Sequence, residues 1–100
     1  MYVVIVEFTV LAQHFEAFVE RVGRQAEDSL ELEPDCHVFD VCLSPDRKDL
    51  VLLYEIYTDR AAFDAHLASN HFHDFNAATL DWVSDKQVST YERIEPGERN

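Results

Sequence analysis

The sequence has little glycine and little proline, with two Gly and three Pro among its 100 residues. These residue types interrupt regular backbone, so their scarcity predicts that most of the chain lies in helices and strands. The chain has no uncharged apolar run near the ~20 residues that span a bilayer. It also has no basic segment followed by an apolar one at its N-terminus. We therefore expect no signal peptide and a cytoplasmic location.

Positive charge is scarce as well, with eight Lys and Arg residues against 20 Asp and Glu and a net charge of −12. Nucleic acid and anionic membrane would repel such a chain, so neither is an expected partner. The sequence also lacks a Gly-rich phosphate loop, a GxGxxG motif and a GxSxG motif. Nucleotide binding therefore has no support.

Cysteine is limited to Cys36 and Cys42, and they form no Cys-x-x-Cys pair. Within one strand these two residues would lie about 20 Å apart, too far for a disulfide. We expect free thiols in a reducing compartment.

The chain does contain strand and helix patterns in alternation. Residues 2–9, 36–43 and 50–57 are rich in β-branched and aromatic types, and residues 86–94 alternate, so we expect four strands. Apolar residues at 3.6-residue spacing predict helices over 12–32 and, interrupted at Ser69-Asn70, over 60–83. The short turn at residues 44–49 predicts a hairpin. Residues 1–94 then form one domain, and 95–100 form a polar C-terminal tail.

The order β-α-β-β-α-β predicts an α+β fold with one antiparallel four-stranded sheet and its helices on one face. The strands around 36–43 and 50–57 are too apolar for their other face to meet water. A second copy of the sheet is the natural cover, so we expect a homodimer. Within strand 36–43, strict alternation predicts that Phe39 and Cys36 lie on opposite faces.

The candidate site is expected in the stretch from Leu50 to Trp82. His66 falls in the apolar stripe of its helix, and a neutral imidazole there can take a proton from a bound phenol or enol. The alternative is a core histidine that bonds to Glu55 or to a backbone carbonyl. Tyr54 and Glu55 alternate, so only one of them can face the helices and His66. Glu55 would either orient His66 or form an ion pair with Arg93 or with a second subunit.

The other histidines and aromatic residues of this half are assigned less directly. His71 and His73 do not share a helix face and, with His66, lack the usual spacing of metal ligands, so we expect no metal. His71 is expected at a helix start on the cavity rim. Phe75 and Trp82 are expected in the core first and as cavity wall second. The full predicted substrate-binding set comprises Phe39, Phe63, His71, Phe72, Phe75 and Trp82.

Three segments resemble the antibiotic biosynthesis monooxygenase family: Cys36–Val41, the turn Ser44–Asp46, and Tyr54–Phe72 with its Tyr-Glu-x-Tyr strand end and Ser-x-His-Phe break. The resemblance spans residues 2 to about 94. It implies ferredoxin-like protomers paired as a dimeric α+β barrel. Many members have Tyr in place of Phe39 and Trp in place of Tyr57. Haem-degrading members have Trp in place of His66 and an iron-binding His in place of Asn76, so that branch is disfavoured.

For function, the resemblance implies cofactor-free oxidation of a quinol or related small aromatic by O₂, with His66, Glu55 and Tyr54 as the catalytic set. The subgroups that it most resembles are quinol monooxygenases and an isomerase-like enzyme that processes phosphorylated autoinducer-2. Two alternatives stay open: a cofactor-free isomerase or lyase on a small keto–enol, and a non-catalytic small-ligand-binding dimer.

Overall fold

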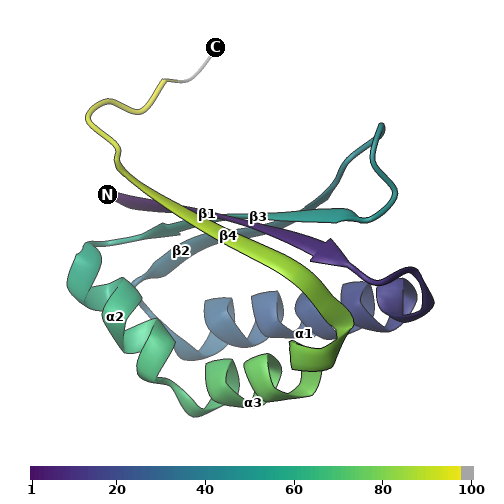
Figure 1. Ribbon diagram of the computed structural model, residues 1–100. Coiled ribbons are helices and arrows are strands. Elements are labelled where there is room, and N and C mark those ends of the chain that lie inside the picture. The colour runs from purple at the N-terminus through teal and green to yellow at the C-terminus, as the bar shows by residue number, and fades with distance from the viewer. Residues whose placement is uncertain (98–100) are drawn as a thin grey trace.

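The computed structural model describes residues 1–97, which form one four-stranded sheet with all helices on one face (Figure 1). The elements follow the predicted order: β1 (Tyr2–Val10), η1 (Ala12–His14), α1 (Phe15–Leu32), β2 (Cys36–Leu43), β3 (Leu50–Tyr57), α2 (Arg60–Ala68), α3 (Asn70–Thr79), η2 (Leu80–Trp82) and β4 (Val83–Glu92). The predicted α+β ferredoxin-like fold is confirmed. Residues 98–100 of the expected polar tail lie outside the described residues.

The strands are ordered β2-β3-β1-β4, and every neighbouring pair is antiparallel. The apolar β1 is therefore central, while β2 and β4 are edges, as the apolar character of residues 2–9 indicates. The last strand is displaced from its predicted range, because it begins at Val83 instead of Lys86 and ends at Glu92 instead of Ile94. The short 3-10 helix η2 follows α3, and Val83, the next residue, pairs with Val10 in β1.

The core lies between the sheet and the helices. Alternate residues of β1 and β3, among them Val4, Phe8 and Val51, are buried there against Phe18 and Val22 of α1. The ring of Phe8 lies 5.0 Å from that of Phe18, centroid to centroid. Full burial of such side chains contributes about 1.5–3 kcal/mol each. This packing fixes α1 against the sheet and leaves α2 and α3 to border the site.

The start of β2 departs from the predicted alternation. Cys36 pairs with Tyr57 while Val38 pairs with Ile56, so the register shifts by a bulge between them. As a result Cys36 and Phe39 are both buried in the helix-facing core, and the prediction that they occupy opposite faces is wrong. Both cysteines are free thiols, as predicted.

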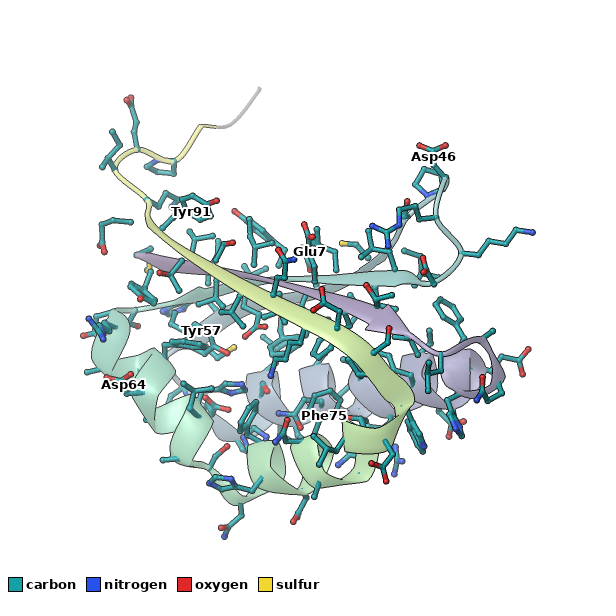
Figure 2. The ribbon with its side chains drawn as sticks, in the orientation of Figure 1. Glu7, Asp46, Tyr57, Asp64, Phe75 and Tyr91 are labelled. Atoms are coloured by element: carbon teal, nitrogen blue, oxygen red, sulfur yellow. The ribbon has the colours of Figure 1, made fainter. Side chains whose placement is uncertain are left out.

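The second face of the sheet carries no helix among residues 1–97. Figure 2 shows Glu7 and Tyr91 projecting from it, away from the helices, while Tyr57 and Phe75 lie between sheet and helices. Val3 and Ile56 are buried on this face, and Tyr91 is 56% exposed. No helix of the described residues is both long enough and apolar enough to cross a membrane.

Candidate active site

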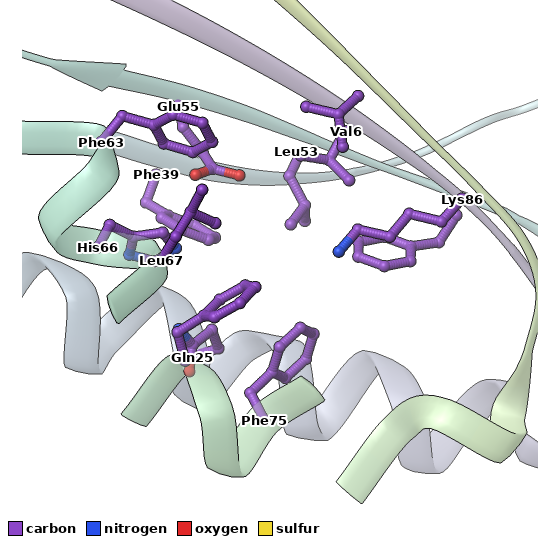
Figure 3. A pocket seen from close by; sticks show the side chains of 13 residues that line it. Val6, Gln25, Phe39, Leu53, Glu55, Phe63, His66, Leu67, Phe75 and Lys86 are labelled. Atoms are coloured by element: carbon purple, nitrogen blue, oxygen red, sulfur yellow. The ribbon is translucent and has the colours of Figure 1, made fainter. Parts of the chain in front are cut away.

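A pocket lies between the helix-facing side of the sheet and the helices α2 and α3 (Figure 3). It has a cavity volume of about 40 Å³ and is partly open to solvent. Its wall is largely aromatic and aliphatic, with four polar exceptions, Gln25, Glu55, His66 and Lys86. The apolar lining consists of Val6, Phe8, Phe39, Leu53, Phe63, Leu67, Phe72, Phe75 and Val88. A mostly apolar pocket with a few placed polar groups is the usual form of a small-molecule site.

His66 reaches this pocket from the last turn of α2. That helix starts at its cap residue Asp59, whose carboxylate accepts a bond from the Ala62 backbone N–H at 2.8 Å. His66 and Leu67 follow Phe63 by three and four residues, so all three share the face of α2 that lines the pocket. His66 is 3% exposed, so its predicted place in the buried stripe is confirmed. Burial lowers the pKa of His66, although the Glu33 carboxylate acts to raise it. The lowered pKa favours a neutral imidazole at pH 7.

The ring of His66 is held by Glu33. Its Nδ1 lies 2.8 Å from Glu33 Oε2 in a hydrogen bond, while its Nε2 has no hydrogen-bond partner among the described residues. When Nδ1–H donates to the carboxylate, the lone pair of the neutral ring is on Nε2. Figure 3 shows the ring at the pocket wall beside Leu67. A carboxylate that fixes one ring nitrogen so that the other can act as a base is the arrangement found in hydrolase triads.

Glu33 is one of the site residues that sequence reasoning missed. The sequence marks it only as the end of a helix before Pro34, and it does end α1, where its N–H donates to Ser29 O at 3.1 Å. Its carboxylate also lies 2.7 Å from His71 Nε2. Nothing local in the sequence signals this role, because both partners come from helices more than 30 residues further along the chain.

Glu55 is the member of the Tyr54–Glu55 pair that faces the helices. It lines the pocket and is 2% exposed, whereas Tyr54 lies on the opposite face of β3. Burial raises the pKa of Glu55 to about 7, although a hydrogen bond from Tyr57 and the charge of Lys86 lower it. The Tyr57 hydroxyl donates to Glu55 Oε1 at 2.6 Å. Within residues 1–97, Glu33 and not Glu55 is the carboxylate bonded to His66, and Glu55 forms no ion pair with Arg93.

The remaining expected site residues divide into two groups. Phe39, Phe63, Phe72 and Phe75 all line the pocket. His71 lies outside the lining, with its Nδ1 3.0 Å from Gln25 Nε2. Trp82 stacks on His14 at 5.6 Å between ring centroids and does not line the pocket.

Lys86 lines the pocket, and the sequence did not single it out. Its Nζ lies 5.5 Å from the ring centroids of both Phe8 and Phe72. Burial lowers the pKa of Lys86, opposed by the charge of Glu55. Lys86 pairs with Phe8 across the sheet and therefore shares its helix-facing side. The sequence did not place Lys86 in the pocket because it predicted that β4 begins at residue 86. The strand in fact begins three residues earlier, at Val83.

The fold is a ferredoxin-like α+β domain. Its pocket, with a histidine–carboxylate pair beside it, has the form of a small-molecule site. Residues 1–78 match the antibiotic biosynthesis monooxygenase family, and the chain belongs to it. No protein with a curated description matches the chain.

Solved structures agree with this assignment. A Nitrosomonas europaea protein named for the same family is 30% identical over 95% of this chain and 100% of its own, with a TM-score of 0.90. One from Bacteroides thetaiotaomicron is 26% identical over 99% of this chain and 94% of its own, with a TM-score of 0.88. A Caulobacter crescentus structure, 18% identical over 94% of this chain and 90% of its own with a TM-score of 0.90, shares the fold. Together the family and these relatives support a monooxygenase-type function in general terms.

Proposed function

We propose that the protein is a cofactor-independent monooxygenase that oxidises a quinol or related small aromatic with O₂, with His66 as general base. The observation that carries this proposal is the hydrogen bond of 2.8 Å between His66 Nδ1 and Glu33. It leaves Nε2 as the basic nitrogen of a buried ring in an aromatic pocket. The phenylalanine lining suits an aromatic ring, and O₂ is a small apolar molecule that such a pocket admits.

The chemistry follows from one proton transfer. His66 Nε2 takes the phenolic proton, which makes the ring more electron-rich and more reactive toward O₂. One oxygen atom is then added to the ring and the other leaves as water, so that a quinol and O₂ give a hydroxyquinone and H₂O. Glu33 holds the tautomer and stabilises the imidazolium that forms. Lys86 and a protonated Glu55 supply a positive charge and a hydrogen-bond donor to the substrate anion.

A second candidate is an isomerase that acts on a small keto–enol through the same base. The observation that favours it is that two buried titratable groups, Glu55 and His66, line one pocket. Burial raises the pKa of Glu55 to about 7 and lowers the pKa of His66. A carboxylic acid and a neutral imidazole beside one substrate can move a proton from one of its atoms to another.

We further propose a homodimer that forms through the face of the sheet without helices. Ile5 and Tyr54 pair across β1 and β3 on this face, and half of Tyr91 is exposed there. A second sheet packed on these residues would bury them. Light scattering after size exclusion should report twice the chain mass, and Ile5→Asp should reduce it to the chain mass. A monomeric wild type would refute the dimer and leave the proposed activity untouched.

The activity is tested by oxygen uptake with chelator-treated protein on a panel of reduced naphthoquinols and benzoquinols. We expect uptake above the autoxidation blank, and a loss of about 10²–10⁴-fold in His66→Ala. The matched control is His73→Ala, because His73 is exposed on α3. Uptake that survives in His66→Ala would remove the base from its role. No uptake, with turnover of enolisable ketones under anaerobic conditions, would favour the isomerase. Neither activity, with saturable ligand binding, would favour a binding protein.

A further inference from the structure

Three side chains from separate segments meet beside the pocket, at the junction of α1, α2 and α3. Glu33 follows α1, His66 lies in α2, and His71 lies in the first turn of α3. One carboxylate oxygen and one nitrogen from each ring all lie within 4.8 Å of one another. His66 is buried, and the Glu33 and His71 side chains are only 16% and 13% exposed. One carboxylate with two imidazoles is a donor set used for Zn²⁺ and other divalent transition metals.

The hydrogen bonding of this cluster is incomplete. His66 Nδ1 bonds to Glu33 Oε2, whereas His71 Nε2 lies 2.7 Å from the same oxygen in an ion-pair contact and has no hydrogen-bond partner. A ring nitrogen that lies beside a carboxylate oxygen without pointing at it directs its lone pair or proton to a third position. Leaving this buried polar atom unpaired costs free energy. A cation at the third position would pair with both the nitrogen and the carboxylate.

Gln25 supports this interpretation from the other side of the His71 ring. It is 1% exposed, its amide nitrogen lies 3.0 Å from His71 Nδ1, and its Oε1 is buried without a partner. An amide rotated by a half-turn would present Oε1 to Nδ1 instead. Nδ1 would then carry the proton and Nε2 the lone pair. A ligating imidazole usually donates its second N–H to such an oxygen.

The cluster is reachable without passing through the aromatic pocket. Glu33 also lines a groove on the surface together with Asp35, Pro34, Leu32, Ala62 and Ala65. The protein carries a net charge of −12, which draws cations to its surface. The Glu33 side chain is 16% exposed, so a metal ion can approach it from solvent.

We infer that Glu33, His66 and His71 bind one divalent transition-metal ion of the Zn²⁺ class. Ligand bonds of about 2.1 Å separate neighbouring donor atoms by roughly 3–3.5 Å. Two of the three separations, 2.8 and 2.7 Å, are already close to this range. Three protein ligands leave the other positions to water. The expectation of no metal considered histidine spacing alone and did not include Glu33.

This site does not depend on the proposed oxygenase activity. The metal uses His66 Nδ1, whereas the base is Nε2 of the same ring. A bound ion displaces the proton from Nδ1 and places it on Nε2, which then donates and no longer accepts. Metal-loaded protein should therefore lose the base, and chelated protein should regain it. Failure of the activity and failure of the metal site are thus separate outcomes.

The test is a titration of untagged, chelator-treated protein with Co²⁺, followed by displacement with Zn²⁺. We expect visible d–d absorption that saturates at one equivalent per chain and disappears with Zn²⁺. His71→Gln and Glu33→Gln should each weaken binding by at least about 100-fold, and Gln25→Met by about 10–100-fold. The matched controls are His73→Gln and Glu31→Gln, both exposed neighbours of the ligands, which should bind as the wild type does.

A measurement on the wild type alone guards against variants that fail to fold. One equivalent of Zn²⁺ should shift the ring ¹⁵N signals of His66 and His71 and leave those of His14, His37 and His73 in place. The inference is overturned if wild-type protein gives no saturable Co²⁺ absorption. It is equally overturned if His71→Gln binds as the wild type does, or if His73 shifts in place of His71.

Discussion

The pocket has two polar sides that are built in different ways. On its strand side, Glu55 and Tyr57 lie two residues apart on β3 and bond directly at 2.6 Å. On its helix side, His66 lines the pocket, while Glu33 and His71 lie outside the lining and meet His66 only in the folded chain. The strand side holds a carboxylate whose pKa burial raises to about 7, while the helix side holds an imidazole whose pKa burial lowers. Both sides thus favour the neutral form, so an acid and a base face one substrate.

The largest expected effect comes from breaking the helix side at Glu33. Glu33→Gln should lower kcat/KM for oxygen uptake by about 10²–10⁴-fold, because an amide can donate to Nδ1 and move the ring proton to Nε2. The Glu33 carboxylate raises the pKa of His66, so its loss should also move the acid limb of the pH–rate profile to lower pH. A purely structural role would not shift this limb. Glu31→Gln is the control, and equal losses in both variants would contradict the proposed pair.

The strand side is tested by pH-dependent stability. Burial raises the pKa of Glu55 from 4.5 to about 7, so between these values the folded protein retains a proton that the unfolded chain has lost. Wild-type stability should therefore fall as the pH rises through this window. Glu55→Gln keeps an acceptor for the Tyr57 hydroxyl and cannot ionise. At pH 8 it should be more stable than wild type by up to about 3 kcal/mol.

Urea unfolding from pH 5 to 8 measures this difference. His66 opposes it, because a lowered folded-state pKa makes stability rise with pH near 6.5. That contribution is present in both proteins and cancels when the two curves are subtracted. The charges of Glu33 and Lys86 also act on Glu55 and remain in both. A difference curve that is flat from pH 5 to 8 would show that Glu55 titrates normally.

These two sides also differ in how far the sequence predicts them. Alternation along β3 already separated Tyr54 from Glu55, and the helical spacing placed His66 on the apolar stripe. The bulge at the start of β2 defeated strict alternation and brought Cys36 to the same side as Phe39. Glu33 left no periodic signal, because its role arises where the end of α1 meets α2 and α3. Local patterns thus predict which face a side chain occupies, but not which distant residue lies opposite.

A smaller effect is expected at the junction that holds the helix side together. Ser69 caps α3, where its Oγ accepts from the Phe72 N–H at 3.3 Å and donates to His66 O at 2.6 Å. Ser69→Ala should lower the free energy of unfolding by about 1 kcal/mol. Ser84→Ala, at an exposed serine in β4, is the control. Equal values for the two variants in urea unfolding would show that the cap contributes nothing.

The smallest effect is expected at Tyr54, which sequence reasoning included in the catalytic set. It lies on the face of β3 opposite the pocket and pairs with Ile5 and Asp40. Tyr54→Phe should change kcat/KM by no more than roughly twofold, since only a hydroxyl remote from the pocket is lost. Tyr57→Phe is the contrast, because it removes the hydrogen bond that lowers the pKa of Glu55, so that this pKa should rise further. A large loss of activity in Tyr54→Phe alone would move the catalytic role to the face between subunits.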